Sequence, residues 1–377
     1  MTEADVPRAD VVGSLLRPGY LVDARAALRA GQLDDDGFGR VADRAVDEAL
    51  RLQEAAGVDV VTDGEMRRTI FFDFLVSGLD GLSPLPSSTI RFHGHRPEDA
   101  MEVTIPFTVT ERLRARSCPG VAELRYAAAR TSLPVKVTLP SPMMMLGFWN
   151  ERSRDAYPDP FELAADAAHA VRGWMRELAD AGCRYIQIDA PELAEAYADE
   201  RVRAEYDERG ISSERFLAVG TELVCGLGDV DLPGVTVAMH LCKGNGTQSW
   251  IAEGGYESLA AEVFRRARGF DRFLLEYDDE RSGSFEPLQQ LPDDKVAVLG
   301  LVSTKWTRLE EVDALRARVE QAARFHPRDR LAVSTQCGFA SASETAEQRR
   351  ITGGTEAAKL KLVADVARAV WGPKELY

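Results

Sequence analysis

The chain has 377 residues, of which 45% are hydrophobic, so it can bury a large core. Its formal net charge is −15, and an acidic chain of this kind repels phosphate backbones and anionic lipid. We therefore expect neither nucleic acid nor a membrane surface as a partner. No apolar run approaches the ~20 residues that cross a bilayer, and the first residues lack the pattern of a secretion signal.

The five cysteines are too few and too scattered to indicate a disulfide framework. We therefore expect a reduced, cytoplasmic protein whose cysteines are buried fillers or metal ligands. They are Cys118, Cys183, Cys225, Cys242 and Cys337.

Short apolar, β-branched runs alternate with helical stretches along the chain. Near-continuous apolar runs are typical of strands that are covered on both faces, and apolar residues at a spacing of three to four predict the helices between them. The expected strands are 10–13, 58–63, 135–139, 185–189, 235–240, 272–277, 296–302 and 331–335. The expected helices are 38–55, 161–178, 213–227, 256–268, 309–325 and 355–370. Eight such units predict a single (β/α)8 TIM barrel over residues 1–377.

Residues 71–117 interrupt this alternation and are expected to form an insertion after the second strand. The segment carries four prolines and a strand pair around Ile90–Phe92 and Glu102–Val109. Long insertions of this kind commonly cover an active site or an oligomer contact.

Polar residues gather at the carboxyl ends of the expected strands, where the chemistry of a (β/α)8 barrel is located. His240 and Cys242 end strand 5, Glu276 ends strand 6 and Cys337 follows strand 8. Two thiolates, one imidazole and one carboxylate form a tetrahedral set that suits Zn²⁺. A metal of this kind would remove the proton from a substrate thiol, whose free pKa is ~8.5. The carboxylate is the ligand that we expect to yield its place to that thiol.

Two plainer interpretations compete with a catalytic zinc site. An isolated cysteine is most often a small buried hydrophobe, which we expect for Cys118, Cys183 and Cys225. A zinc site can also be structural, but structural sites use closely spaced ligand pairs, whereas Cys337 lies far from Cys242 in the sequence.

At these residues the sequence resembles the cobalamin-independent methionine synthase family, in particular its C-terminal catalytic barrel. The matching stretches, in family order from residue 11 to about residue 345, are VVGSLLRP, TDGEMRR, YIQIDAPEL, MHLCKGN, FLLEYDDERSGSFEPL and LAVSTQCGFAS. The last three carry the zinc ligands His240, Cys242, Glu276 and Cys337.

The resemblance implies homocysteine as the methyl acceptor, a 5-methyltetrahydrofolate as the donor and methionine as the product. It implies that Gly13 and Ser14 bind the substrate carboxylate and that Glu65 and Asp189, as catalytic and binding residues, hold its ammonium group. Alternatively, Glu65 pairs with Arg67 or Arg68, and Asp189 caps the helix that follows Pro191.

The sequence departs from the family in one respect, because the full-length synthase has two barrels and this chain has one. Short single-barrel relatives include proteins similar to epoxyalkane:coenzyme M transferase, which activates a different thiol. The carboxylates Glu65 and Asp189 favour an amino-acid thiol, since they would repel a sulfonate. A uroporphyrinogen decarboxylase-like enzyme would need no cysteine ligands, and a non-catalytic zinc- or thiol-binding barrel is a further alternative. Assembly into a homo-oligomer is compatible with all of them.

The sequence does not choose the acid that protonates the donor's leaving group. The candidates are Asp63, Asp278, Asp279 and Glu280. Lys243 and Lys305 near the barrel mouth would meet a folate glutamate or would be ordinary surface lysines. Phe148 and Trp149 would stack on a flat pterin or pack in the core.

Overall fold

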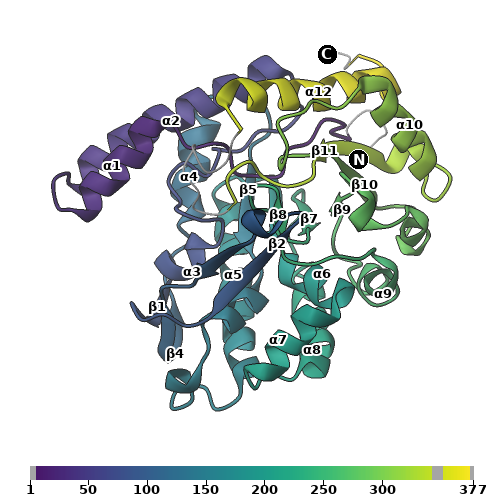
Figure 1. Ribbon diagram of the computed structural model, residues 1–377. Coiled ribbons are helices and arrows are strands. Elements are labelled where there is room, and N and C mark those ends of the chain that lie inside the picture. Colours follow the sequence, from purple (N-terminus) through teal and green to yellow (C-terminus); the bar gives the residue numbers. More distant parts are fainter. Residues whose placement is uncertain (1–5, 342–350, 374–377) are drawn as a thin grey trace.

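In the computed structural model, which describes residues 6–341 and 351–373, a parallel sheet forms the centre and helices surround it (Figure 1). Six strands are hydrogen-bonded in the order β11-β10-β9-β7-β6-β5. All neighbours in this order are parallel. The strands are β5 (Lys136–Pro140), β6 (Tyr185–Asp189), β7 (Thr236–Leu241), β9 (Arg272–Glu276), β10 (Val296–Val302) and β11 (Leu331–Thr335).

The first two expected strands lie between β11 and β5 and close the ring. Each makes single parallel bridges instead of a long ladder. The closing hydrogen bonds run from Asp10 N to Val333 O (2.9 Å), from Asp59 N to Ala9 O (2.8 Å) and from Val61 N to Pro134 O (3.0 Å). The predicted (β/α)8 barrel is therefore confirmed.

The first strand is a single bridge at Ala9, one residue before the predicted segment 10–13, and side chains take two carbonyl groups of that segment. The buried Lys136 ammonium donates to the carbonyl of Val11. The Gln187 amide donates to the carbonyl of Val12 at 2.9 Å. With these acceptors used, the ladder does not extend beyond Asp10, and both buried carbonyl groups have the partner that burial requires.

The helices cover the outside of the sheet, and α12 packs against both α2 and α10 (Figure 1). Helix α2 is capped at its N-terminus by Asp34, whose carboxylate accepts from Gly37 N at 2.8 Å. Gly57 caps its C-terminus with a φ of 81°, which suits glycine. The helices are α1 (Gly19–Arg29), α2 (Asp35–Ala56), α3 (Asp73–Ser77), α4 (Gly120–Ala128), α5 (Pro160–Asp180), α6 (Pro191–Ala198), α7 (Glu200–Glu208), α8 (Ser213–Cys225), α9 (Glu257–Leu259), α10 (Val312–Ala322) and α12 (Gly353–Trp371).

One predicted helix is shorter and less regular than expected. The segment 256–268 is α-helical only in α9 and continues as a π-helical turn at Ala260–Phe264. The wide turn keeps Ala260, Val263 and Phe264 fully buried together, so packing against the barrel prevails over regular helix geometry.

The insertion forms two small antiparallel sheets. β1 (Leu79–Ser83) pairs with β4 (Thr108–Ala115). β2 (Thr89–Gly94) pairs with β3 (Met101–Thr104) and with β8 (Ser249–Trp250), a short strand that follows β7 (Figure 1). The predicted strand pair is confirmed, but its second strand ends before Pro106, which has no N–H to donate to a ladder.

The apolar core has two parts, a large one between sheet and helices and a small one inside the barrel. A fully buried ionic group completes the barrel interior. Asp10 accepts from Lys136 at 3.0 Å, from Arg272 at 3.1 Å and from Tyr185 at 2.7 Å. Such charges are tolerated in the interior because each is paired.

Among the described residues, every helix is too short or too polar to serve as a membrane span.

Candidate active site

One cavity of about 640 Å³ opens at the carboxyl ends of the strands. Seven of the eight residues that the sequence singles out line this cavity, although they are scattered over most of the chain. They are Gly13, Ser14, Glu65, Asp189, His240, Cys242 and Cys337. The eighth, Glu276, ends β9 nearby but is not part of the lining.

His240, Cys242 and Cys337 come together as a compact group whose ligand atoms all lie within 4.8 Å of one another. His240 and Cys242 are two residues apart at the end of β7, so their side chains leave the strand on the same side. Cys337 follows β11. The ring closure described above brings this last strand to the same mouth.

The imidazole of His240 is oriented towards metal binding. Its Nδ1 contacts the carbonyl of Leu274 at 3.2 Å, and its buried Nε2 has no hydrogen-bond partner in the described part of the chain. A backbone carbonyl on one ring nitrogen fixes the tautomer that leaves the other nitrogen free as a ligand.

The thiols of Cys242 and Cys337 change each other's pKa. Contact with the Cys242 thiol lowers the pKa of Cys337, and the same contact raises the pKa of Cys242. The lowered pKa of Cys337 favours its thiolate, which is the form that binds a metal. Two sulfurs and one imidazole with an unpartnered nitrogen, all buried, fit a zinc ion.

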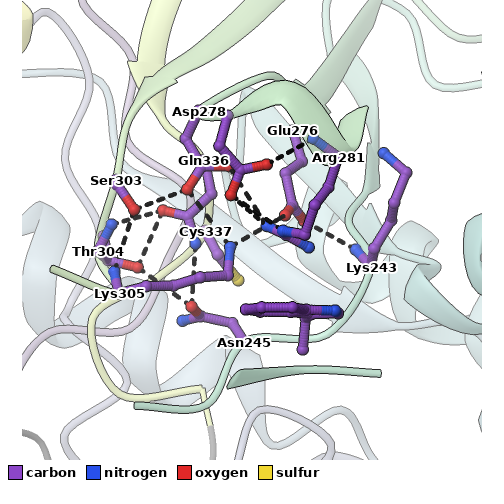
Figure 2. Close-up of polar contacts among 12 residues, drawn as sticks. Lys243, Asn245, Glu276, Asp278, Arg281, Ser303, Thr304, Lys305, Gln336 and Cys337 are labelled. Carbon is purple, nitrogen blue, oxygen red and sulfur yellow. Dashed lines mark hydrogen bonds and ion pairs between the residues drawn. The ribbon is translucent and has the colours of Figure 1, made fainter. Parts of the chain in front are cut away.

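Glu276 is held by cations instead of lying in the His–Cys–Cys group (Figure 2). Its Oε1 accepts from Lys305 Nζ at 2.9 Å and from Arg281 Nη2 at 3.2 Å, and its Oε2 accepts from Lys243 N at 2.8 Å. Burial alone would raise the pKa of Glu276, but Lys305, Lys243 and Arg281 lower it to about 2. The carboxylate is thus ionised, and it contacts the backbone of the residue that follows Cys242.

Glu65 occupies a strained position on the opposite side of the mouth. Its φ of 56° lies in the left-handed region, which non-glycine residues seldom adopt. Its Oε1 accepts from Thr138 at 2.7 Å, and Arg68 lies 3.5 Å from the same oxygen. Oε2 is buried without a partner among the described residues. The alternative pairing with Arg68 is therefore real, but it leaves one oxygen available to a ligand.

Asp189 does not cap the helix that follows it, since α6 begins at Ala190 without a side-chain cap. Its carboxylate accepts from Gln187 at 2.6 Å. Burial raises the pKa of Asp189 to about 7, with His240 opposing the shift and Glu65 adding to it. An incoming ammonium group would favour the ionised form of both carboxylates.

Gly13 lies directly against Glu65. A Cβ at position 13 would stand 2.7 Å from Glu65 Oε1 and 3.2 Å from Thr138 Cγ2. Ser14 contacts the loop after β11 that carries Cys337, because its hydroxyl accepts from Ala340 N at 3.3 Å. The first and last turns of the barrel therefore fix each other.

The two lysines at the mouth are not surface residues. The Lys243 ammonium is fully buried, 3.8 Å from the centre of the Tyr256 ring. Lys305 is buried against Glu276 and Asp278. Of the two aromatic candidates, Trp149 lines the cavity, while Phe148 packs edge-on against Phe72 in the core.

The expected acids near β9 are used in ion pairs. Asp278 contacts Lys305 at 3.5 Å, and Asp279 accepts from Arg281 at 2.8 Å. Glu280 is exposed. Asp63 accepts from Glu65 N at 2.8 Å through one oxygen and has no partner for the other in the described structure.

Two buried carboxyl groups in the cavity are missing from the sequence prediction. Glu192 and Glu195 lie in α6, three residues apart, and both line the cavity. Burial raises the pKa of Glu192 to about 7 and raises that of Glu195 well above its ordinary value. Their position in the first turns after β6 was the available signal, because barrel helices begin at the active-site end.

The insertion supplies much of the apolar wall of the cavity. Ile90 and Phe92 of β2, Val103 of β3 and Ile105 all line it. Residues of the insertion thus line the cavity, and its strand β2 pairs with β8.

Comparison with known proteins agrees with this architecture. Residues 9–360 match the family model described as "Cobalamin-independent synthase, Catalytic domain". The chain is 36% identical to the uncharacterized protein YxjH of Bacillus subtilis, over 97% of this chain and 94% of that protein. It is similar to the crystal structure of a putative vitamin-B12-independent methionine synthase from Listeria monocytogenes, with a TM-score of 0.72, 25% identity and coverage of 97% and 98% of the two chains. A B12-independent methionine synthase from Shewanella, solved with selenomethionine, shares the fold with a TM-score of 0.74 at 19% identity, over 97% and 98% of the chains. The chain belongs to the cobalamin-independent methionine synthase family.

Proposed function

We propose that the protein transfers a methyl group to the thiol of homocysteine and so forms methionine, with a 5-methyltetrahydrofolate-type donor. The observation that carries the proposal is the His240–Cys242–Cys337 group inside a cavity that also holds Glu65 and Asp189. A thiol-activating group and an ammonium-binding group in one cavity match the two ends of an amino-acid thiol.

His240, Cys242 and Cys337 would hold Zn²⁺, with Glu276 as the fourth ligand that yields its place to the substrate. When bound, the ion would make the substrate thiol acidic enough to be a thiolate at neutral pH. The unpartnered His240 Nε2 supports this assignment.

The substrate's amino-acid end would lie between the first two turns of the barrel. Glu65 Oε2 and the Asp189 carboxylate would accept from the ammonium group, and the Gly13–Ser14 segment would receive the carboxylate. Because Glu65 is fixed by Thr138, the ammonium is held in one place and the sulfur is directed to the cysteine side of the cavity.

The donor would occupy the part of the cavity between Trp149 and the insertion. Ile90, Phe92 and Val103 would exclude water around the reacting carbon. Attack by the thiolate breaks the bond between the methyl carbon and the donor nitrogen, and the nitrogen must gain a proton as it leaves. The carboxyl groups of Glu192 and Glu195 line the same cavity, and burial raises the pKa of both, so they are the candidates for the acid that supplies it.

The test combines metal content with turnover. The purified protein should hold about one zinc per chain, and both Cys242→Ser and Cys337→Ser should lose the metal and the formation of methionine. Cys183→Ser is the matched control, since Cys183 is equally buried but lies outside the group. Turnover is measured with homocysteine and a panel of mono- and polyglutamyl methylfolate, methylcobalamin and S-methyl donors. Full zinc in both cysteine variants, or no methionine from any donor, would refute the proposal.

A further inference from the structure

The arrangement of charges around Glu276 is unusual for a metal-binding carboxylate. Lys305 and Glu276 both have fully buried side chains and lie 2.9 Å apart, and Arg281, whose side chain is 10% exposed, lies 3.2 Å from the same oxygen. Charge-assisted hydrogen bonds in a buried site are strong. Oε1 of this carboxylate is therefore directed at cations of the protein itself, while Oε2 accepts from the backbone N of Lys243 (Figure 2).

Both cations are fixed independently of Glu276. Arg281 also binds Asp279 at 2.8 Å and lies over the ring of Trp250 at 4.2 Å. Lys305 lies 3.5 Å from Asp278. If the Glu276 carboxylate moved away, Lys305 would still contact Asp278 and Arg281 would still contact Asp279. Neither cation would be left buried without an anionic partner, which is the arrangement that costs most stability.

The segment that carries Lys305 is joined to the cysteine loop. Thr304 N donates to the Gln336 amide oxygen at 2.6 Å, and the Gln336 amide nitrogen donates to Asn245 at 2.9 Å (Figure 2). Gln336 precedes Cys337, and Asn245 is three residues from Cys242. These contacts link the segment of Lys305 to the segments that carry Cys242 and Cys337.

The position of Glu276 is also close to the metal-binding group. Its Oε2 accepts from the amide of Lys243, the residue after Cys242, at 2.8 Å. The same carboxylate therefore contacts both Lys305 and the backbone of the residue that follows Cys242.

We propose that Lys305, assisted by Arg281, is a positioning residue that provides Glu276 with a second binding place, so that the carboxylate alternates between the metal and the lysine. With Glu276 on Lys305, His240, Cys242 and Cys337 would hold the metal, and the substrate thiol would take the place of the carboxylate. This rests on the proposed zinc site, and it adds that a lysine of this chain sets how easily the fourth ligand leaves.

The experiment measures metal binding in the full-length protein, without turnover. The metal is removed and replaced by Co²⁺, whose absorption spectrum reports the ligand set, and Zn²⁺ affinity is measured by competition with a chromophoric chelator. The variants are Glu276→Gln, Lys305→Met and the double variant. Lys305→Arg tests conservative rescue. Lys359→Met is the matched control, because Lys359 is also buried and paired with a carboxylate, Glu310, at 3.2 Å.

The expected result is a coupling between the two positions. Lys305→Met should tighten Zn²⁺ binding by about tenfold, because Glu276 loses its competing partner. It should also weaken the response of the Co²⁺ spectrum to added homocysteine. Glu276→Gln should abolish this gain in the double variant, while changing the affinity little in the wild-type background. Lys305→Arg and Lys359→Met should behave as the wild type.

Equal effects of Glu276→Gln in the presence and absence of Lys305 would overturn the proposal. Unchanged or weaker Zn²⁺ binding in Lys305→Met would do so too. If Lys305→Met fails to fold, Lys305→Gln and Arg281→Met remove the same attraction with smaller changes. Metal binding with coupling but no methionine synthesis would refute only the proposed reaction, whereas absence of metal binding would refute both.

Discussion

Glu65 is the residue whose geometry most directly supports the proposed ammonium site. It combines a left-handed backbone, one oxygen fixed by Thr138 and one oxygen buried without a partner in the described structure. A buried acceptor left unpaired costs stability, so its retention indicates that a ligand completes it.

Glu65→Gln should therefore lower the affinity for homocysteine by about 10- to 100-fold, which is the usual effect of losing a hydrogen bond to a charged group. A simple alkyl thiol such as 2-mercaptoethanol, which has no ammonium group, should be affected by less than threefold. Both affinities can be measured by calorimetry with the metal-loaded protein. Parallel losses for the two thiols would mean that Glu65 does not bind the ammonium.

Residue types at strand ends could be predicted from the sequence, but their partners could not. The sequence indicated His240, Cys242 and Cys337, and the structure brings these three together. It gave no sign that Lys305 lies against Glu276, because that contact joins two segments 29 residues apart through the barrel mouth. For the same reason both mouth lysines were open to interpretation as surface residues.

At the scale of elements, the turns after the first two strands act as one unit. Gly13 follows the first strand and Glu65 follows the second, and the absence of a side chain at position 13 makes room for the carboxylate. The first strand makes its bridge at Ala9, one residue before the predicted segment, and the second makes its bridge at Val61, inside the predicted segment. In the first strand, the side chains of Lys136 and Gln187 take carbonyl groups that a ladder would use. Local pattern cannot reveal such long-range substitutions.

Gly13→Ala tests this coupling between the two turns. The added methyl group would lie 2.7 Å from Glu65 Oε1, so Glu65 must move, and homocysteine affinity should fall by about as much as in Glu65→Gln. Gly19→Ala is the control, because a Cβ there meets nothing within 4 Å and lies in helix α1. Its stability should be unchanged or raised by up to about 1 kcal/mol. Unaltered binding in Gly13→Ala, measured by calorimetry, would argue against a precise position for Glu65.

At the scale of the whole molecule, the buried ionisable groups of the cavity lower the free energy of unfolding of the protein. Glu192 and Asp189 each have a pKa of about 7 because of burial. Neither value would be expected of a group that serves the fold alone, since a neutral side chain of the same shape would avoid the cost. Functional sites are where such groups accumulate.

This cost predicts how stability depends on pH. Glu192 has an ordinary pKa of 4.5 and a folded-state pKa of about 7. Between these pH values the folded protein binds one more proton at Glu192 than the unfolded chain does. Its contribution to the free energy of unfolding therefore falls by about 1.4 kcal/mol for each unit of rising pH and is constant above the upper value.

Glu192→Gln removes this contribution, because glutamine cannot ionise and has nearly the same shape. Measured by urea unfolding, the variant should match the wild type near pH 4 and should be more stable at pH 8 by up to about 3 kcal/mol. Glu200→Gln is the control, since the side chain of Glu200 is 93% exposed, and it should follow the wild-type curve throughout. A Glu192→Gln curve parallel to that of the wild type would mean that Glu192 is ionised in the folded protein, and the cavity would then offer one proton fewer to a departing amine.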